Sequence, residues 1–481
     1  YLEYGELGLV YESVNERARL MRLARHLVRP LPFLAANYRG DRRHLVTIDA
    51  GLWLYEALCF FQSYKNHRTM GPKRTLELEP ALRHDDLRGS VLFYDCLTDD
   101  ARLTLENAMD ARELGATLVN HVAAKSLLRS SSGDIIGVSA HVADSNEHFD
   151  IRAKVIVNAS GPWTDEVRSM AGETSVLKPT KGIHIVVDSR RLPTKHALMM
   201  TSPRDGRVVF CIPWGLGRTV VGTTDTFFDG SPDCVNADAR DVEYLIEAAN
   251  RYYPEAQIVP DDVLATWAGL RPLLKPEDSA RGASALSREH MLYERTGFLT
   301  IAGGKLTTYR TMSAMVVDRA LFQLGVFKRS TTKDRSIPGA RGITESDTQL
   351  ENLAHELERS LGDGPTARNF AEMYGTRGIS VAERVRQSQM AAQRIDPELP
   401  YLMAQVDEAV ENEFAVTLSD VLERRIPLIL RARDQGLGAV PQVAVRMAEL
   451  LQWSSASTQR EIDRYRQSVN ASRQFLARPL P

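Results

Sequence analysis

The chain has 481 residues, 43% hydrophobic and 25% charged, which is typical of a globular protein with a core large enough for two or three domains. Its 60 Lys and Arg residues nearly balance 62 Asp and Glu residues, which argues against a nucleic-acid partner. No apolar run is long enough for a transmembrane helix. The scattered cysteines lack metal-site or redox spacing, so we expect no metal site and reduced thiols in a cytoplasmic protein.

The first predicted element is a helix close to the start of the chain. The chain opens on Tyr1 rather than Met, in the middle of a pattern, and we expect an N-terminal piece to be missing from it. Apolar residues from Leu7 to Leu27 recur at helical spacing and predict a helix that stops by Pro30.

A basic and aromatic segment follows at 39–74. Its basic residues flank an apolar, aromatic stretch around Trp53 and Tyr55. A helix of this kind suits an anionic membrane surface, because apolar burial and attraction to lipid headgroups add. A helix packed on the protein's own core would have the same composition, and the sequence favours neither interpretation.

Strand and helix patterns then alternate up to residue 171. They predict strands at 91–94, 117–128 and 135–142, with a helix at 100–114. A buried strand at 154–159 ends in the turn Ser160-Gly161-Pro162-Trp163, and a helix follows at 165–171. Small residues at a strand end let the backbone approach a phosphate-bearing cofactor closely, although an ordinary αβ crossover shows the same pattern.

The middle third predicts a mixed or antiparallel sheet, with strands at 183–187, 263–271 and 291–295. Strands at 208–213 and 219–224 flank a glycine-containing turn, which is a hairpin signal. After about residue 330 the pattern is helical, with helices expected at 347–361, 381–395 and 442–453. This last region shows no catalytic constellation.

The stretch 297–310, GFLTIAGGKLTTYR, predicts a buried strand that runs through a glycine pair into a helix. Such a turn leaves backbone N–H groups free at the helix start and favours negative charge there. Lys305 lies at this point. An ordinary strand-to-helix turn with an exposed lysine would give the same pattern.

Five motifs carry a resemblance to a known family. They are NASGPW at 158–163, KGIHIVV at 181–187, VGTTDT at 221–226, GLRPL at 269–273 and GGKLTTYR at 303–310. In this order and spacing they are similar to those of FAD-dependent glycerol-3-phosphate dehydrogenase, and the similarity covers essentially the whole chain. The chain departs from the family pattern in one respect, because it contains no GxGxxG fingerprint for the FAD pyrophosphate.

The resemblance implies a fold of α/β and α+β character, of the FAD-binding glutathione-reductase-like or D-amino-acid-oxidase-like type, whose N-terminal βαβ unit is missing. Residues 1–180 and 296–328 would form an incomplete FAD-binding domain that includes the segment at 39–74. Residues 181–295 would form an antiparallel-sheet substrate domain, and residues 329–481 an all-α C-terminal domain.

Three side chains suit the chemistry of alcohol oxidation. His184 is the candidate base for the hydroxyl proton, because imidazole titrates near neutral pH. Arg271 offers a planar fork for a phosphate dianion, and Lys305 would stabilise negative charge on a reduced flavin and contact substrate. A hydrogen-bonded histidine on a strand, a salt-bridged arginine and an exposed lysine are the structural alternatives.

The resemblance adds further site residues. Tyr1 matches an active-site tyrosine, and Thr224 and Asp225 would face the substrate cavity, where Thr224 would bind substrate and Asp225 could equally be a turn residue. The residues expected to contact FAD are Val122, Ala159, Ser160, Gly161, Trp163, Gly303, Gly304, Lys305, Leu306 and Thr307.

The implied function is oxidation of sn-glycerol 3-phosphate to dihydroxyacetone phosphate, with electrons passed from FAD to a membrane quinone. The segment at 39–74 would then dock the protein peripherally on the anionic inner face of the cell membrane. Two alternatives are a glycerophosphate oxidase that uses O2 and a truncated, non-catalytic binding protein. The sequence leaves open whether the protein is a homodimer.

Overall fold

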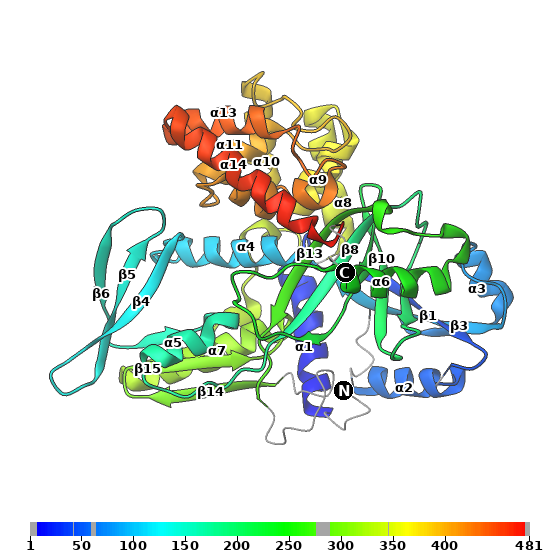
Figure 1. Cartoon of the computed structure of the whole chain (residues 1–481), viewed down its shortest axis with the longest axis horizontal. Coiled ribbons are helices and arrows are strands. Elements are labelled where there is room, and N and C mark those ends of the chain that lie inside the picture. Colours follow the sequence, from blue (N-terminus) through cyan, green and yellow to red (C-terminus); the bar gives the residue numbers. More distant parts are fainter. Residues whose placement is uncertain (1–6, 42, 59–63, 276–288, 345, 477–481) are drawn as a thin grey trace, which may run out of the picture.

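The computed structural model describes residues 7–41, 43–58, 64–275, 289–344 and 346–476. Tyr1, Arg42 and positions 59–63 of the basic aromatic segment lie outside the described residues. Figure 1 shows a large sheet on the right, a smaller α/β part at the lower left, and the helices of the C-terminal region above both.

The large sheet has nine strands, in the order β12-β8-β11-β10-β9-β1-β3-β2, with β13 also paired to β8. Among the described strands of this sheet, β1 and β9 form the one parallel pair, so the predicted mixed or antiparallel sheet and its β10–β11 hairpin are confirmed. The strands are β1 (Arg29–Tyr38), β2 (Arg68–Met70), β3 (Leu87–Leu97), β8 (Thr180–Asp188), β9 (Ala197–Thr201), β10 (Val208–Gly215), β11 (Arg218–Gly222), β12 (Thr226–Phe227) and β13 (Val263–Arg271).

Strand β8 shows why this sheet has two different faces. Ile183, Ile185 and Val187 are buried on the face that packs against helix α6 (Ala239–Tyr252). Because strand side chains alternate, His184 projects from the opposite face. β1, β2 and β3 precede residue 180, so the sheet crosses the predicted domain boundary. The sequence could not show this, because the periodicity of a strand indicates which side chains share a face but not which strand it pairs with.

The smaller part consists of two three-stranded sheets. β7 lies parallel to β15, while the hairpin β14–β15 and the β4–β5–β6 meander are antiparallel. Helices α5 and α7 cover it (Figure 1). The elements are β4 (Val122–Arg129), β5 (Ile135–Val142), β6 (His148–Arg152), β7 (Ile156–Asn158), β14 (His290–Arg295), β15 (Phe298–Gly303), α5 (Thr164–Met170) and α7 (Tyr309–Gln323).

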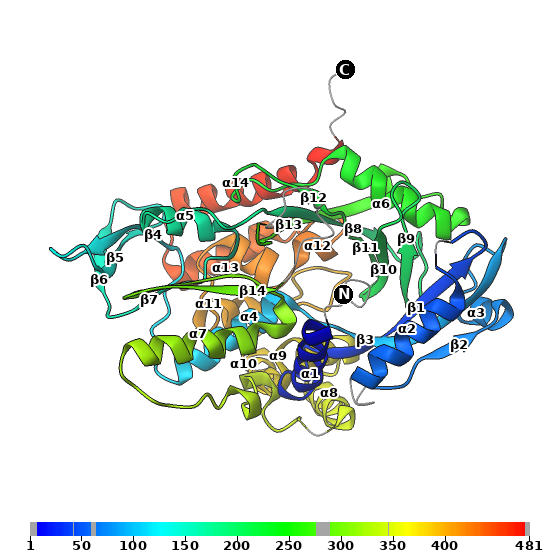
Figure 2. The same ribbon diagram turned by 90° about the horizontal axis from the view of Figure 1, so that it is seen from below.

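Four further helices come from the first part of the chain, namely α1 (Leu7–Leu23), α2 (Leu45–Leu58), α3 (Pro72–Leu78) and α4 (Asp100–Glu113). The first predicted helix is therefore confirmed, but it ends at Leu23, before the expected stop near His26 to Pro30, and a turn at 24–27 leads into β1. α1 lies between the large sheet and the smaller part in Figures 1 and 2. Its Glu16 forms two 2.7 Å hydrogen bonds with Arg310 of α7.

The C-terminal region is helical, as predicted, and has its own hydrophobic core. The helix expected at 381–395 is wrong in its second half, since α10 ends at Gln387 and Ser388 is extended. Ala391 and Ile395 are nevertheless buried. The apolar residues at helical spacing are therefore core residues, but the backbone that carries them is irregular. The helices are α8 (Asp347–Leu361), α9 (Gly364–Tyr374), α10 (Gly378–Gln387), α11 (Met403–Glu411), α12 (Leu428–Arg431), α13 (Val440–Leu451) and α14 (Ser455–Ser472).

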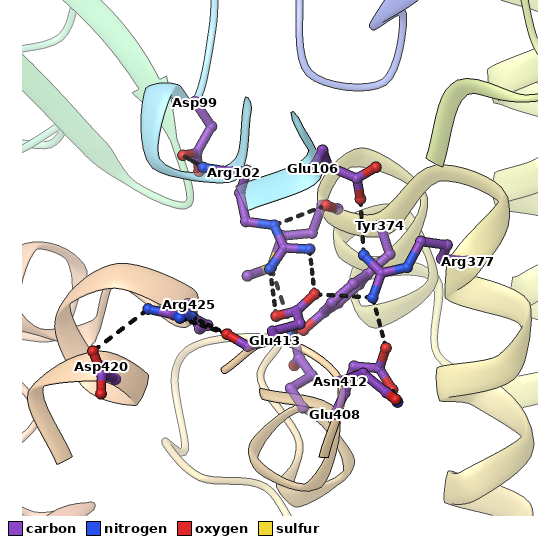
Figure 3. A network of polar contacts seen from close by, with 12 residues as sticks. Asp99, Arg102, Glu106, Tyr374, Arg377, Glu408, Asn412, Glu413, Asp420 and Arg425 are labelled. Carbon is purple, nitrogen blue, oxygen red and sulfur yellow. Dashed lines mark hydrogen bonds and ion pairs between the residues drawn. The ribbon is translucent and has the colours of Figure 1, made fainter. Parts of the chain in front are cut away.

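A buried network of charges joins this region to α4 (Figure 3). Arg102 of α4 donates two 2.7 Å hydrogen bonds to the carboxylate of Glu413, and Arg377 contacts Glu106, Glu408 and Glu413. Burial alone would raise the pKa of Glu413, but the charges of Arg102 and Arg377 and their hydrogen bonds lower it. Glu413 is therefore ionised and fully paired inside the protein.

Candidate active site

The first part of the site is the glycine turn after β15. Gly303 and Gly304 have φ values of +76° and +93°, which glycine adopts without strain. A Cβ on Gly304 would also meet the end of the flexible Met312 side chain of α7, which would have to move. Lys305 follows and begins the short 3-10 helix Leu306–Thr308 that leads into α7, and its Nζ lies 3.3 Å from the Ser13 hydroxyl of α1.

The second part is the turn after β7. The Asn158 side chain is buried and accepts hydrogen bonds from both the N–H and the hydroxyl of Ser160. Gly161 has a φ of +57° and opens the 3-10 helix Gly161–Trp163. The Trp163 indole donates to Asp233, beyond β12. β7 and β15 are parallel neighbours, so both turns lie at the same edge of the sheet, where α/β proteins bind nucleotide cofactors.

His184 lies on β8, between a glycine and a tryptophan. A Cβ on Gly222 of β11, directly opposite, would stand 2.1 Å from the imidazole, so only glycine leaves room for the ring. The other face of the imidazole stacks on Trp267, with ring centroids 4.5 Å apart and planes 11° apart. Burial, together with the charge of Arg271, lowers the pKa of His184 to about 4, so the ring is neutral at pH 7.

Arg271 lies on β13 beside it. Its guanidinium covers Gly182, where a Cβ would stand 2.5 Å from the Nη2 atom. Asp225 accepts a 3.1 Å hydrogen bond from Nη1, and the Thr223 hydroxyl and the Thr224 carbonyl accept from Nη2 at 3.1 and 3.2 Å. These contacts hold the guanidinium next to His184.

Two crossing segments connect the sheet to the glycine turn. Leu177 and Leu274 form an antiparallel bridge, and the N–H of Lys178 donates to the carbonyl of Leu273. A Cβ on Gly303 would stand 3.2 Å from Leu274, only three residues beyond Arg271. The chain therefore brings the end of β13 against the glycine turn.

The predicted site residues differ in where the structure places them. Those of the two turns gather at one sheet edge, and His184 and Arg271 lie together on the large sheet. Thr224 is 4% exposed and its hydroxyl accepts the N–H of Ile183, so it anchors its loop on β8. Val122 begins β4 on the meander, opposite Val142. Tyr1 lies outside the described residues.

Sequence reasoning missed four residues that shape this site, namely Gly182, Gly222, Trp267 and Ser13. The two glycines stand inside the quoted motifs, two residues before His184 and two before Thr224, and a glycine within a strand signals close approach of another group. Trp267 and Ser13 had no local signal, because their partners are distant in sequence.

The parallel strand ends with glycine turns, beside a mostly antiparallel sheet, define the architecture of an FAD-dependent oxidoreductase. Residues 1–310 match the family model described as FAD dependent oxidoreductase, and residues 330–458 match that described as the C-terminal domain of alpha-glycerophosphate oxidase.

Several known proteins are similar to this chain. The aerobic glycerol-3-phosphate dehydrogenase of Staphylococcus saprophyticus is 34% identical over 466 residues, which cover 95% of this chain and 82% of that protein. The glycerol-3-phosphate dehydrogenase of Synechocystis sp. is 33% identical over 487 residues, with 97% and 86% coverage. The chain belongs to the family of FAD-dependent glycerol-3-phosphate dehydrogenases.

Solved structures agree with this assignment. The glycerol-3-phosphate dehydrogenase of Bacillus halodurans, complexed with FAD, has a TM-score of 0.81 and 28% identity, over 97% of this chain and 87% of that chain. The L-alpha-glycerophosphate oxidase of Mycoplasma pneumoniae shares the fold, with a TM-score of 0.51 and 14% identity over 69% and 85% of the two chains.

The two turns fit the flavin cofactor of this family. The position of a Cβ on Gly161 has no described atom within 4 Å, so a flat ligand can approach the backbone there. Within the described ranges, no side chain caps the two 3-10 helices that begin after Ser160 and at Leu306, which leaves the N–H groups at the start of each for a ligand. The described residues contain no acidic, His and Cys cluster able to hold a metal and no helix able to cross a membrane.

Proposed function

We propose that the protein oxidises sn-glycerol 3-phosphate to dihydroxyacetone phosphate and passes the electrons to a membrane quinone. The observation that carries the proposal is the placement of His184 and Arg271 on the paired strands β8 and β13, each side chain against a glycine, with Arg271 at the strand end that meets the glycine turn. A base and a phosphate-binding fork side by side match a substrate with a hydroxyl next to a phosphorylated carbon.

The roles follow from the environments of the side chains. His184 is neutral at pH 7 and accepts the proton of the C2 hydroxyl. Arg271, fixed by Asp225 and Thr223, binds the phosphate, and its charge also keeps His184 unprotonated until substrate arrives. Bound FAD supplies the two-electron acceptor for the C2 hydride. Lys305, at the start of a helix, favours negative charge in the turn.

The acceptor is tested with the purified FAD-loaded protein. We expect anaerobic, glycerol 3-phosphate-dependent reduction of a soluble quinone at many times the rate of O2 consumption. If peroxide forms in air at the rate of substrate oxidation while quinone reduction is slow, the electron acceptor is O2 and not a quinone.

An oxidase is the second candidate, and a specific observation favours it. The helical region at 330–458 matches a model described from alpha-glycerophosphate oxidase. The same assay separates the two candidates, because substrate and site are shared and only the electron acceptor differs.

Replacing Arg271 with lysine tests the phosphate site. Lysine keeps the charge but loses the planar fork, so we expect KM for glycerol 3-phosphate to rise about 10- to 100-fold. Flavin content, measured by absorbance, should stay at the wild-type level. Arg204→Lys, at an exposed ion pair with Glu247, is the matched control and should leave KM unchanged. An unchanged KM in Arg271→Lys would remove this residue from the phosphate site.

The basic aromatic segment supports a second part of the proposal, docking on an anionic lipid surface. On α2, Val46 is 79% exposed and Trp53 52% exposed, and Leu54 is exposed beside them. Exposed basic residues precede and follow α2 along the chain, namely Arg39, Arg43, Lys65, Arg68, Lys73 and Arg74. Exposed apolar side chains in a segment rich in exposed cations are typical of a peripheral membrane protein's lipid-facing surface.

Sedimentation with liposomes rich in anionic lipid tests this surface. The double variant Trp53→Ser, Leu54→Ser should bind at least about tenfold more weakly than wild type at low salt, because each side chain loses apolar burial. Phe327→Ser is the control for non-specific apolar binding, because it removes an aromatic side chain that is 87% exposed and lies outside this segment. Equal binding by wild type and the double variant would contradict docking through α2.

A further inference from the structure

A row of stacked side chains runs from His184 to the C-terminal helical region. Trp267 stacks on His184, and Trp214 of β10 stacks on Trp267, with centroids 5.6 Å apart and planes at 30°. The guanidinium carbon of Arg431, the last residue of α12, stands 3.8 Å from the centre of the Trp214 ring. Four residues that are far apart in sequence thus form one continuous stack.

Each member of the stack is fixed by the backbone. Trp267 is directly opposite His184 in the β13–β8 pair. Trp214 sits at a register shift in β10, where a bulge redirects a side chain. Arg431 donates a 3.0 Å hydrogen bond to the carbonyl of Trp214, and its own carbonyl accepts a 2.7 Å hydrogen bond from Arg218. The stack is therefore anchored at both ends.

The surroundings close the same face of the sheet. Val186, Val220 and Ala265 are buried beneath the two indoles, and Leu430 of α12 packs on them. Figure 2 shows α12 beside β13. On this face of the sheet, the His184 ring lies between Gly222 and Trp267.

We infer that Arg431 is a positioning residue for His184, acting through Trp214 and Trp267, so that the C-terminal region holds the base in register with the substrate. This inference rests on the proposed function, because it takes His184 as the base. The physical basis is that a planar guanidinium stacked on an indole resists tilting of that indole, and each ring resists tilting of the next. Small displacements of a catalytic group are costly in rate.

The test compares Arg431→Met with Arg433→Met, two residues along. Arg433 also ties this segment to the sheet, through Asp188, and to Glu398, but it does not stack on Trp214. We expect Arg431→Met and Trp267→Leu to lower kcat about 10- to 100-fold with KM changed less than about twofold. Arg433→Met should keep the wild-type kcat, and Trp267→Phe should retain more activity than Trp267→Leu.

A readout independent of turnover is the histidine NMR spectrum of the FAD-loaded protein, with the His184 signal assigned by its loss in His184→Gln. Among the described residues, Arg271 is the charged side chain that acts on the His184 pKa, and burial acts more strongly. Loosening the stack admits water, so we expect the His184 signal to titrate nearer the ordinary imidazole pKa of about 6.5 in Arg431→Met and Trp267→Leu. It should not do so in wild type or Arg433→Met.

The outcomes separate the two claims. An unchanged His184 signal in both stack variants, or the same kcat loss in Arg433→Met as in Arg431→Met, overturns the positioning role. A shifted His184 signal with wild-type kcat would show that the stack positions the imidazole. It would also show that His184 is not the base, so the proposed function and not the stack would fail.

Discussion

Replacing His184 with alanine is expected to lower kcat for glycerol 3-phosphate oxidation by about 10²- to 10⁴-fold, the usual loss when a general base is removed. The pKa of His184, lowered to about 4 by burial and by Arg271, keeps the imidazole able to accept a proton throughout the neutral range. Loss of rate through protonation of this ring in free wild-type enzyme is therefore expected only as the pH approaches about 4.

The measurement is steady-state turnover with flavin content recorded for each variant. His355→Ala removes an exposed histidine of α8 and should behave as wild type. Because the base acts in the transition state, kcat and kcat/KM should fall together in His184→Ala. Near wild-type turnover in that variant would show that another group, or water, takes the proton.

The glycine turn could be predicted from the sequence because everything that defines it is local. The apolar run at 298–302, the glycine pair and the helical spacing after Lys305 stand within one short stretch, and the structure has β15, the turn and α7 at these places. The fold class followed from several such stretches in a fixed order, and the family comparisons confirm it.

The arrangement of the active site depends on contacts between strands and could not be predicted from those stretches singly. His184 was chosen for its chemistry, but the room for its ring comes from Gly222, and its stacking partner Trp267 is 83 positions away along the printed sequence. Likewise the sequence predicts a strand at 91–94, within β3, but only the pairing of β3 with β1 and of β1 with β9 places it in the large sheet. Periodicity assigns a face to a side chain, whereas register assigns its neighbour.

The same distinction applies to the charges between α4 and the C-terminal region. From the sequence Arg102 is one arginine of an amphipathic helix, and a charged helix face is normally solvated. In the structure its side chain is 1% exposed, and that of Glu413, 311 residues away, is fully buried. Such pairs are found only when the fold brings both partners together.

Arg102→Met is therefore expected to destabilise the protein by about 3–5 kcal/mol, because it leaves the Glu413 carboxylate buried with only part of its pairing. Urea unfolding followed by circular dichroism gives the free energy. Methionine keeps most of the length of the side chain, so the loss reflects charge rather than a large cavity. Arg368→Met breaks a pair with Glu351 whose side chains are 53% and 49% exposed, and should cost less than about 1 kcal/mol.

The pH dependence gives this prediction a second test. Glu413 has a lowered pKa in the folded protein, so its ion pairs contribute stability above its ordinary value of 4.5, and that contribution is lost as the pH falls through the lowered value. In Arg102→Met the loss of stability at pH 7 comes from the buried negative charge of Glu413, which is neutralised when acid protonates the carboxylate. The difference in unfolding free energy between wild type and variant should hence shrink as the pH is lowered below about 4.5. A difference that is constant with pH would assign the loss to packing around Tyr374, on which the Arg102 guanidinium also rests at 4.6 Å.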